Sequence, residues 1–125
     1  MNVVDSSGWI EYFVDGGNAR FFSPPLRDLE NLLVPTICIY EVFKRLLMER
    51  DEDSALLAAG IMSHGREVEL DRKIAIEAAQ LSRQLKLAMA DSIILATARA
   101  CDAILWTQDE HFKGMEGVKF IEKKG

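Results

Sequence analysis

Four acidic side chains are distributed along this sequence in positions that suit a shared metal ion. Asp5 ends a short apolar segment at the N-terminus, and Asp109 lies two residues beyond Thr107, where a later apolar segment ends. Glu41 and Asp91 lie near the starts of two predicted helices. Mg²⁺ and Mn²⁺ prefer oxygen ligands, and a cation held by carboxylates can bind a phosphate and lower the pKa of an attacking water. The four acids therefore indicate metal-dependent chemistry on a phosphate ester.

The elements that would position these acids alternate between strand and helix. Short apolar runs predict five strands, at residues 2–5, 32–34, 68–70, 103–107 and 118–121. Apolar residues at helical spacing predict helices over residues 6–14, 36–48, 52–62, 71–85 and 89–101, and residues 21–25 are expected to be irregular or to begin a short helix. Strands that are apolar on both faces and alternate with helices are typical of an α/β fold, with a short parallel sheet between two layers of helices.

In such a sheet, ligands bind beyond the carboxyl ends of the strands. Asp5 and Asp109 lie at the carboxyl ends of two predicted strands. Glu41 and Asp91 lie near the starts of two predicted helices, which face the same end of the sheet. The four carboxylates are therefore expected to converge. Ser6 and Thr107 carry hydroxyl groups next to these acids. Each could orient a carboxylate or a metal-bound water by a hydrogen bond, and each also suits an ordinary cap or strand end.

Each acid also has a structural explanation. Asp91 lies where an Asp caps a helix and favours its dipole, and Asp109 precedes a predicted turn at residues 110–112 that it could cap. Glu41 shares a helix with an apolar face, so an inward carboxylate there would need a partner. Asp5 has no evident structural duty, because the two serines that follow it suit the N-cap. The predicted apolar face beside Glu41 consists of Ile37, Tyr40, Phe43 and Leu47.

Length and charge limit the classes of function. The 125 residues suit one domain, residues 1–125, and the net charge of −5 argues against binding nucleic acid by bulk electrostatics alone. No apolar run approaches the length of a membrane span, and no basic segment followed by an apolar stretch indicates a secretory signal, so a cytoplasmic protein is expected. Cys38 and Cys101 each lie among apolar residues, and neither belongs to a CxxC pair. One pair of cysteines is weak support for a disulfide.

Four segments resemble the motifs of one known family, the PIN-domain ribonucleases that act as VapC toxins in VapBC toxin–antitoxin systems. Residues 2–7 (NVVDSS) resemble the opening of these proteins, and residues 35–41 (PTICIYE) resemble their second motif. Residues 89–98 (MADSIILATA) are similar to the third motif, and residues 107–112 (TQDEHF) to the final Thr-x-Asp-x-x-Phe motif. The motifs occur in order and span almost the whole chain. Gln108 departs from the family, in which many members carry a basic residue after the threonine.

The resemblance implies a PIN-like fold and Mg²⁺- or Mn²⁺-dependent hydrolysis of RNA. It implies that Asp5 and Asp91 are the most direct metal ligands, that Glu41 and Asp109 complete the acidic site, and that Thr107 supports it. It also implies a homodimer and a VapB-like antitoxin that reaches into the site.

Two alternatives follow from the same residues. A phospho-receiver domain would need adjacent acids after the first strand and a lysine after a later one. Asp5 is followed by two serines and no lysine ends residues 103–107, so this alternative is rejected. A non-catalytic, dimeric PIN-like interaction module would keep the acids only as caps. Its contacts would come from the aromatic side chains of Trp9, Tyr12, Phe13 and Phe43, which are more simply explained as core.

Basic and histidine side chains near the motifs are weaker candidates. Lys44 and Arg45 follow Glu41, and Arg20 and Arg27 lie after the first helix, where they could guide RNA. Ordinary solvated charge is the simpler explanation for each of them. The two histidines belong to no recognised catalytic motif, so no role is expected for them: they are His64 and His111.

Overall fold

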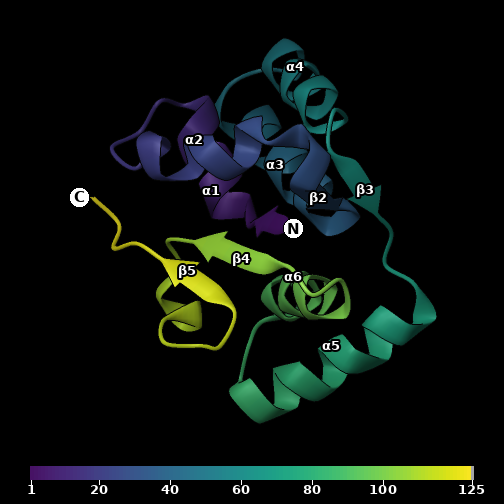
Figure 1. The fold of residues 1–125 in the computed structure, drawn as a ribbon. Helices are drawn as coiled ribbons and strands as arrows, with labels where there is room; N and C mark the ends of the chain where they lie inside the picture. The colour runs from purple at the N-terminus through teal and green to yellow at the C-terminus, as the bar shows by residue number, and fades with distance from the viewer. Residues whose placement is uncertain (125) are drawn as a thin grey trace.

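Five parallel strands form one sheet in the computed structural model, which describes residues 1–124. Their order across the sheet is β3-β2-β1-β4-β5, and every neighbouring pair is parallel. The chain therefore crosses over between successive strands, as the alternation of strand and helix predicts (Figure 1). The strands are β1 (Asn2–Val4), β2 (Leu32–Pro35), β3 (Arg66–Val68), β4 (Ile104–Thr107) and β5 (Val118–Phe120).

Helices cover both faces of the sheet, which confirms the predicted α/β architecture. Figure 1 shows α5 and α6 on one side of β4 and the first four helices on the other. The helices are α1 (Ser6–Phe13), α2 (Ala19–Arg27), α3 (Thr36–Glu49), α4 (Glu52–Met62), α5 (Arg72–Leu85) and α6 (Met89–Ala100), with short 3₁₀ turns η1 (Leu29–Asn31) and η2 (Glu110–Phe112). Within residues 1–124, none of these helices has the length and apolar character that crossing a bilayer requires.

The core lies between the central strands and the helices against them. Val3, Val4 and all of β2 are buried, and the aromatic side chains of Trp9, Phe22 and Phe112 fill the space around them. Residues 92–98 of α6 are buried without interruption, as a helix that is apolar on nearly all sides requires. The cysteine thiols are both free, with Cys38 buried and Cys101 half-buried.

The buried face of α3 differs from the predicted one. Cys38, Val42 and Leu46 point into the core, whereas Tyr40 and Leu47 are 59% and 44% exposed. Apolar residues surround most of this helix, so spacing alone did not identify the side that packs. The observed rotation places the 38–42–46 stripe inward and leaves the neighbouring position, Glu41, at the edge of the core.

Two elements lie elsewhere than predicted. Residues 19–27 form a continuous helix, α2, so the segment is helical and not irregular, and Pro24 and Pro25 lie inside the helix and not in its first turn. Burial of Phe22, Pro25 and Leu26 offsets the backbone hydrogen bonds that the prolines cannot donate. The edge strand β3 begins two residues before the predicted run, because it is largely exposed and its pairing with β2 needs no apolar alternation.

Candidate active site

The four acids gather at the carboxyl edge of the sheet. β1 and β4 are neighbours, with Val4 opposite Trp106, and the Asp5 N–H continues this pairing by donating to the Trp106 carbonyl at 3.1 Å. Because the two strands are parallel, Asp5 and Asp109 lie at the same end of the sheet, where both strands have their carboxyl ends. The helices that follow contribute the other two carboxylates, Glu41 from α3 and Asp91 from α6.

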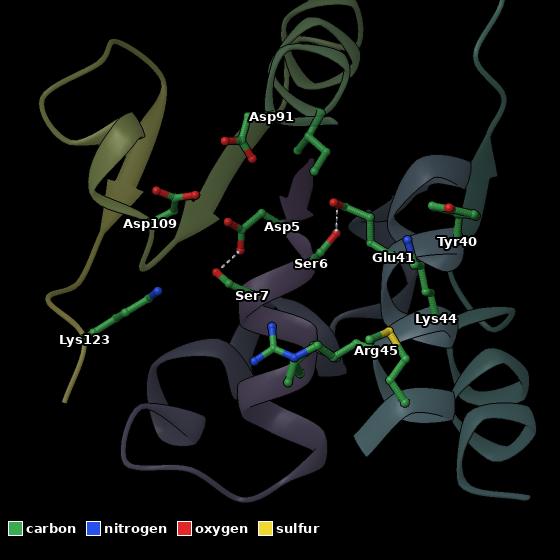
Figure 2. A pocket seen from close by; sticks show the side chains of 13 residues that line it. Asp5, Ser6, Ser7, Tyr40, Glu41, Lys44, Arg45, Asp91, Asp109 and Lys123 are labelled. Atoms are coloured by element: carbon green, nitrogen blue, oxygen red, sulfur yellow. Dashed lines mark hydrogen bonds between the residues drawn. The ribbon is translucent and has the colours of Figure 1, made fainter. Parts of the chain in front are cut away.

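A single open hollow of about 400 Å³ receives all four carboxylates. Figure 2 shows Asp5, Asp91 and Asp109 facing one another across it, with Glu41 on the wall that α3 supplies. The predicted convergence of the acids is therefore present in the fold. The hollow is lined by Asp5, Ser6, Ser7, Ile10, Tyr40, Glu41, Lys44, Arg45, Met48, Asp91, Ile94, Asp109 and Lys123.

Asp5 is the most buried of the four acids, with only 3% of its surface exposed. It is the N-cap of α1, where Oδ1 accepts hydrogen bonds from the Gly8 N–H and the Ser7 hydroxyl, both at 2.9 Å. The expectation that Asp5 lacks a structural duty and that a serine caps this helix is thus wrong. Burial raises the pKa of Asp5 to about 6, hydrogen bonds led by that from Thr107 oppose the rise, and the Asp109 carboxylate adds to it.

Asp91 has no capping role, although capping is the simplest structural explanation for its position. The N-cap of α6 is Ala88, without a side-chain hydrogen bond, and the Asp91 carboxylate faces the hollow instead. The pKa of Asp91 is raised to about 6, mainly by partial burial and then by the carboxylates of Asp109 and Glu41, whereas His111 opposes the rise. The site therefore disfavours the charged form of Asp91, although this side chain caps no helix. A bound cation would stabilise that charge.

The remaining two acids are held by specific partners. Glu41 Oε1 accepts a hydrogen bond of 2.6 Å from the Ser6 hydroxyl, so the half-buried carboxylate has the partner that its position demands. Asp109 caps η2, since its Oδ1 accepts from the His111 N–H at 2.9 Å. The capping explanation for Asp109 is confirmed, and the same side chain also faces the hollow.

Thr107 joins the two acids at the strand ends. Its fully buried hydroxyl donates to Asp5 Oδ2 at 2.6 Å and accepts from the Asp109 N–H at 2.9 Å. One side chain therefore sets the orientation of one carboxylate and the backbone of the other. This is the supporting position that the sequence predicts for Thr107.

Replacing Thr107 with valine is expected to lower metal affinity about 10- to 100-fold, because Asp5 and Asp109 both lose their fixed orientation. Serine at this position keeps the hydroxyl and is expected to retain most of the affinity. Calorimetric titration of Mn²⁺ into both variants measures the difference. Equal affinities for the valine and serine variants would show that the hydroxyl does not position the site.

The hollow also contains residues that the sequence did not indicate. Ser7 binds Asp5, and Tyr40 and Lys123 line the walls. No local sequence pattern marks these three positions as part of a site. Lys123, for example, reaches the hollow from the C-terminal segment. Lys44 and Arg45 line the hollow as considered from the sequence, whereas Arg20 and Arg27 are absent from its lining among the described residues.

Gln108, the departure from the family pattern, is a structural residue. It is buried, and its Oε1 accepts a hydrogen bond of 2.9 Å from the Asn18 side chain. This bond ties the end of β4 to the start of α2. The residue does not line the hollow.

Comparison of the sequence with models of known protein families identifies the family to which this chain belongs. The sequence model of the PIN domain matches residues 3–118, a range that includes all four acids. The chain belongs to the PIN-domain family. No curated protein matches its sequence at a significant level.

Solved structures share this PIN-domain fold over nearly the whole chain. A chain of a toxin–antitoxin complex from Klebsiella pneumoniae matches with a TM-score of 0.78 and 24% identity, covering 95% of this chain and 96% of that one. A chain of the VapBC2 complex from Rickettsia felis, bound to a DNA fragment from its promoter, matches with a TM-score of 0.74 and 12% identity, covering 97% of both chains. The sarcin–ricin-loop-cleaving toxin VapC20 of Mycobacterium tuberculosis matches with a TM-score of 0.68 and 16% identity, covering 82% and 85%.

Proposed function

We propose that this protein is a metal-dependent endoribonuclease that hydrolyses phosphodiester bonds in RNA. The observation that carries the proposal is the convergence of four carboxylates, from four separate elements, on one open hollow of a PIN-domain fold. A structural role explains Asp5 and Asp109 in part, since both cap helical turns. Capping does not explain Asp91, which makes no cap and lines the hollow with three other acids.

The donor set fits a hard divalent cation, Mg²⁺ or Mn²⁺. Such ions take carboxylate oxygens and retain several waters, which an open hollow accommodates. Asp91 and Asp109, whose carboxylate oxygens lie within 4.8 Å of each other, would hold the ion, and Asp5 and Glu41 line the same hollow and would complete the acidic site around it. Burial is the main cause of the raised pKa values of Asp5 and Asp91, and neighbouring carboxylates raise both further. A bound cation would favour the charged form of both side chains. When bound, the ion supplies charge stabilisation at the scissile phosphate and acidifies the attacking water.

The chain's own polar residues prepare the site for that ion. Thr107 and Ser7 donate to the two oxygens of Asp5, and Ser6 donates to Glu41 Oε1. These hydroxyls fix the carboxylates before the ion arrives, so little reorganisation accompanies binding.

Three basic side chains line the hollow and would supply contacts for RNA phosphates. Figure 2 shows Lys44 and Arg45 reaching the hollow from α3, with Lys44 beside Tyr40, and Lys123 below Asp109 on the C-terminal segment. The exposed ring of Tyr40 lies next to Lys44, whose Nζ is 5.7 Å from the ring centre, and offers a face for an unpaired base. These local contacts reconcile RNA binding with a net charge of −5.

The biological role that we propose is that of a VapC-type toxin, held inactive by a VapB-like antitoxin and acting as a homodimer in the cytoplasm. Solved neighbours of this fold include toxin–antitoxin complexes from two organisms, and another neighbour is a toxin that cleaves the sarcin–ricin loop. Apolar side chains left exposed on α3 and α4 are of the kind that protein partners cover, and they include Met48, Leu56 and Leu57. The aromatic residues considered for such contacts from the sequence pack in or against the core instead.

The test is cleavage of a single-stranded RNA oligonucleotide by metal-free protein. We expect no cleavage in the presence of EDTA and full cleavage when millimolar Mn²⁺ or Mg²⁺ is restored. Calorimetric titration of the same preparation should show one ion site per chain. Cleavage that persists in EDTA would contradict metal dependence, and ion binding without cleavage of any RNA would favour the non-catalytic interaction module.

A further inference from the structure

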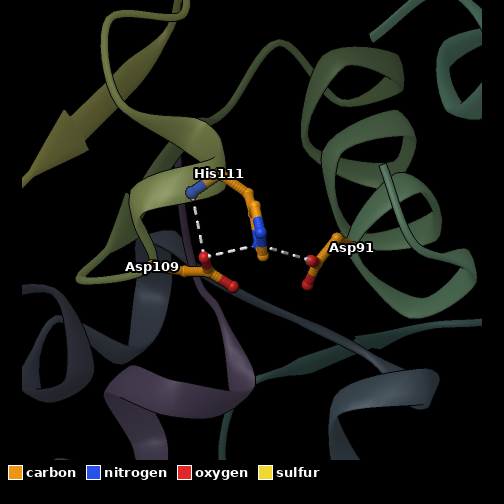
Figure 3. A group of neighbouring side chains, drawn as sticks. All are labelled: Asp91, Asp109 and His111. Atoms are coloured by element: carbon orange, nitrogen blue, oxygen red, sulfur yellow. Dashed lines mark hydrogen bonds and ion pairs between the residues drawn. The ribbon is translucent and has the colours of Figure 1, made fainter. Parts of the chain in front are cut away.

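His111 lies between the carboxylates of Asp91 and Asp109, two of the acids that line the hollow (Figure 3). Its Nδ1 is 2.9 Å from Asp109 Oδ1 and 3.8 Å from Asp91 Oδ2. The side chain is 71% exposed, so packing does not force it into this position. The imidazole ring instead lies against the carboxylates of Asp91 and Asp109, so its attraction to these two negative charges explains its position.

The fold holds the ring in that place through the turn that Asp109 caps. Asp109 Oδ1 accepts the His111 N–H at 2.9 Å, which fixes the backbone of residue 111 directly above the carboxylate. Asp91 approaches from α6, on the other side of the ring. Two separate elements therefore present one nitrogen and two carboxylates to the same point.

The separations fit ligands of a single ion. One ligand atom from each of Asp91, Asp109 and His111 lies within 4.8 Å of the other two. Adjacent ligands of an octahedral ion, each about 2.1 Å from it, are about 3 Å apart. An imidazole nitrogen and a carboxylate oxygen at 2.9 Å need a proton or a cation between them, because both atoms carry lone pairs.

We propose that His111 is a nitrogen ligand of the divalent ion in this centre, beside Asp91 and Asp109, and that the centre consequently prefers Mn²⁺ to Mg²⁺. Imidazole nitrogen binds transition-metal ions well, whereas Mg²⁺ takes oxygen ligands and water. The inference rests on the proposed function, because it assigns one more ligand to the same ion. It adds a specific ion preference that four carboxylates alone would not produce.

The test compares ion binding by the wild type with binding by His111→Ala, using MnCl₂ and MgCl₂ in separate calorimetric titrations. We expect the substitution to weaken Mn²⁺ binding about 10- to 100-fold and Mg²⁺ binding by less than about threefold. His64→Ala is the matched control, since His64 lines a different hollow and is the only other histidine in the chain. Equal losses for the two ions, or no loss for either, would overturn the proposal.

A spectroscopic measurement separates ligation from positioning. Pulsed electron paramagnetic resonance of bound Mn²⁺ should show coupling to a histidine ¹⁴N nucleus in the wild type and in His64→Ala, and no such coupling in His111→Ala. Asparagine at position 111 can still donate a hydrogen bond to Asp109 but has no imidazole nitrogen. Full recovery of Mn²⁺ affinity in His111→Asn would overturn ligation and assign a positioning role instead.

The outcomes for the two proposals are distinguishable. Mn²⁺ binding that Asp91→Asn removes and His111→Ala leaves unchanged would overturn the histidine ligand while the nuclease proposal stands. Absence of binding of either ion to the wild type at millimolar concentration would overturn both.

Discussion

Replacing Asp91 with asparagine is expected to lower metal-dependent RNA cleavage by about 10²- to 10⁴-fold while the fold persists. The substitution removes a negative charge from the ion site and retains the size of the side chain. A catalytic ion contributes several kcal/mol of transition-state stabilisation, and each 1.36 kcal/mol corresponds to a factor of ten in rate. Asp91 makes no cap and accepts no hydrogen bond from the backbone, so its loss leaves α6 intact.

The same variant is expected to be more stable than the wild type when no metal is present. The pKa of Asp91 rises from 3.8 to about 6 on folding, so the native state retains a proton in a range where the unfolded chain has lost it. Native stability from this group is therefore full below pH 4 and falls as the pH rises toward 6. Asparagine avoids that loss, which we place at about 1–2 kcal/mol above pH 6, because the side chain is partly solvated.

Urea denaturation in EDTA at pH 4 and pH 7, with cleavage assays on the same preparations, measures both effects. The stability gain should be present at pH 7 and absent at pH 4, and added Mn²⁺ should stabilise only the wild type. Asp53→Asn is the matched control, since Asp53 is exposed on α4 and does not line the hollow. Undiminished cleavage by Asp91→Asn would remove this residue from the site.

Replacing Gly8 with alanine is expected to destabilise the fold by about 1–3 kcal/mol. A Cβ at this position would lie 2.6 Å from Val4 Cγ1 and 2.7 Å from Phe22 Cε1, and both of these neighbours are fully buried. The clash outweighs the gain of about 1 kcal/mol that alanine brings to a helix. The Gly8 N–H also donates to Asp5, so displacement of α1 is expected to weaken ion binding as well.

Gly60→Ala is the control for helix propensity. Gly60 is exposed in α4 and nothing lies within 4 Å of the position that a Cβ would take, so alanine there should stabilise the protein by up to about 1 kcal/mol. Combining Gly8→Ala with Phe22→Leu, which shortens the opposing ring, should cost less than the sum of the single substitutions. Similar free energies of unfolding for Gly8→Ala and Gly60→Ala would show that α1 does not depend on this close approach.

Local patterns predicted the elements that carry the acids. An apolar run closed by an acid marked β1 and Asp5, and the Thr-x-Asp spacing marked the end of β4 and Asp109. The small and apolar residues on nearly all sides of residues 89–101 predicted a buried helix behind Asp91, and residues 92–98 are buried. These predictions hold because strand and helix periodicity depend on near neighbours in the chain.

Patterns that depend on packing were predicted less well. The apolar residues around α3 allowed more than one inward face, and the contacts of the core selected Cys38, Val42 and Leu46. The prolines of α2 favoured an irregular segment, and burial of its apolar face produced a helix. In both places tertiary contacts outweighed the local preference.

The sequence by itself determined the fold class, the order of the elements and the identity of the four acids, because each is encoded by residues close together in the chain. Only the tertiary structure decided the burial, the hydrogen-bond partners and the pKa values of those acids. Thr107 reaches Asp5 across 102 positions of sequence and Ser6 reaches Glu41 across 35, and no local pattern specifies such contacts. The raised pKa values, the capping by Asp5 and the ring of His111 between two carboxylates all arise from burial and proximity, which exist only after the chain has packed.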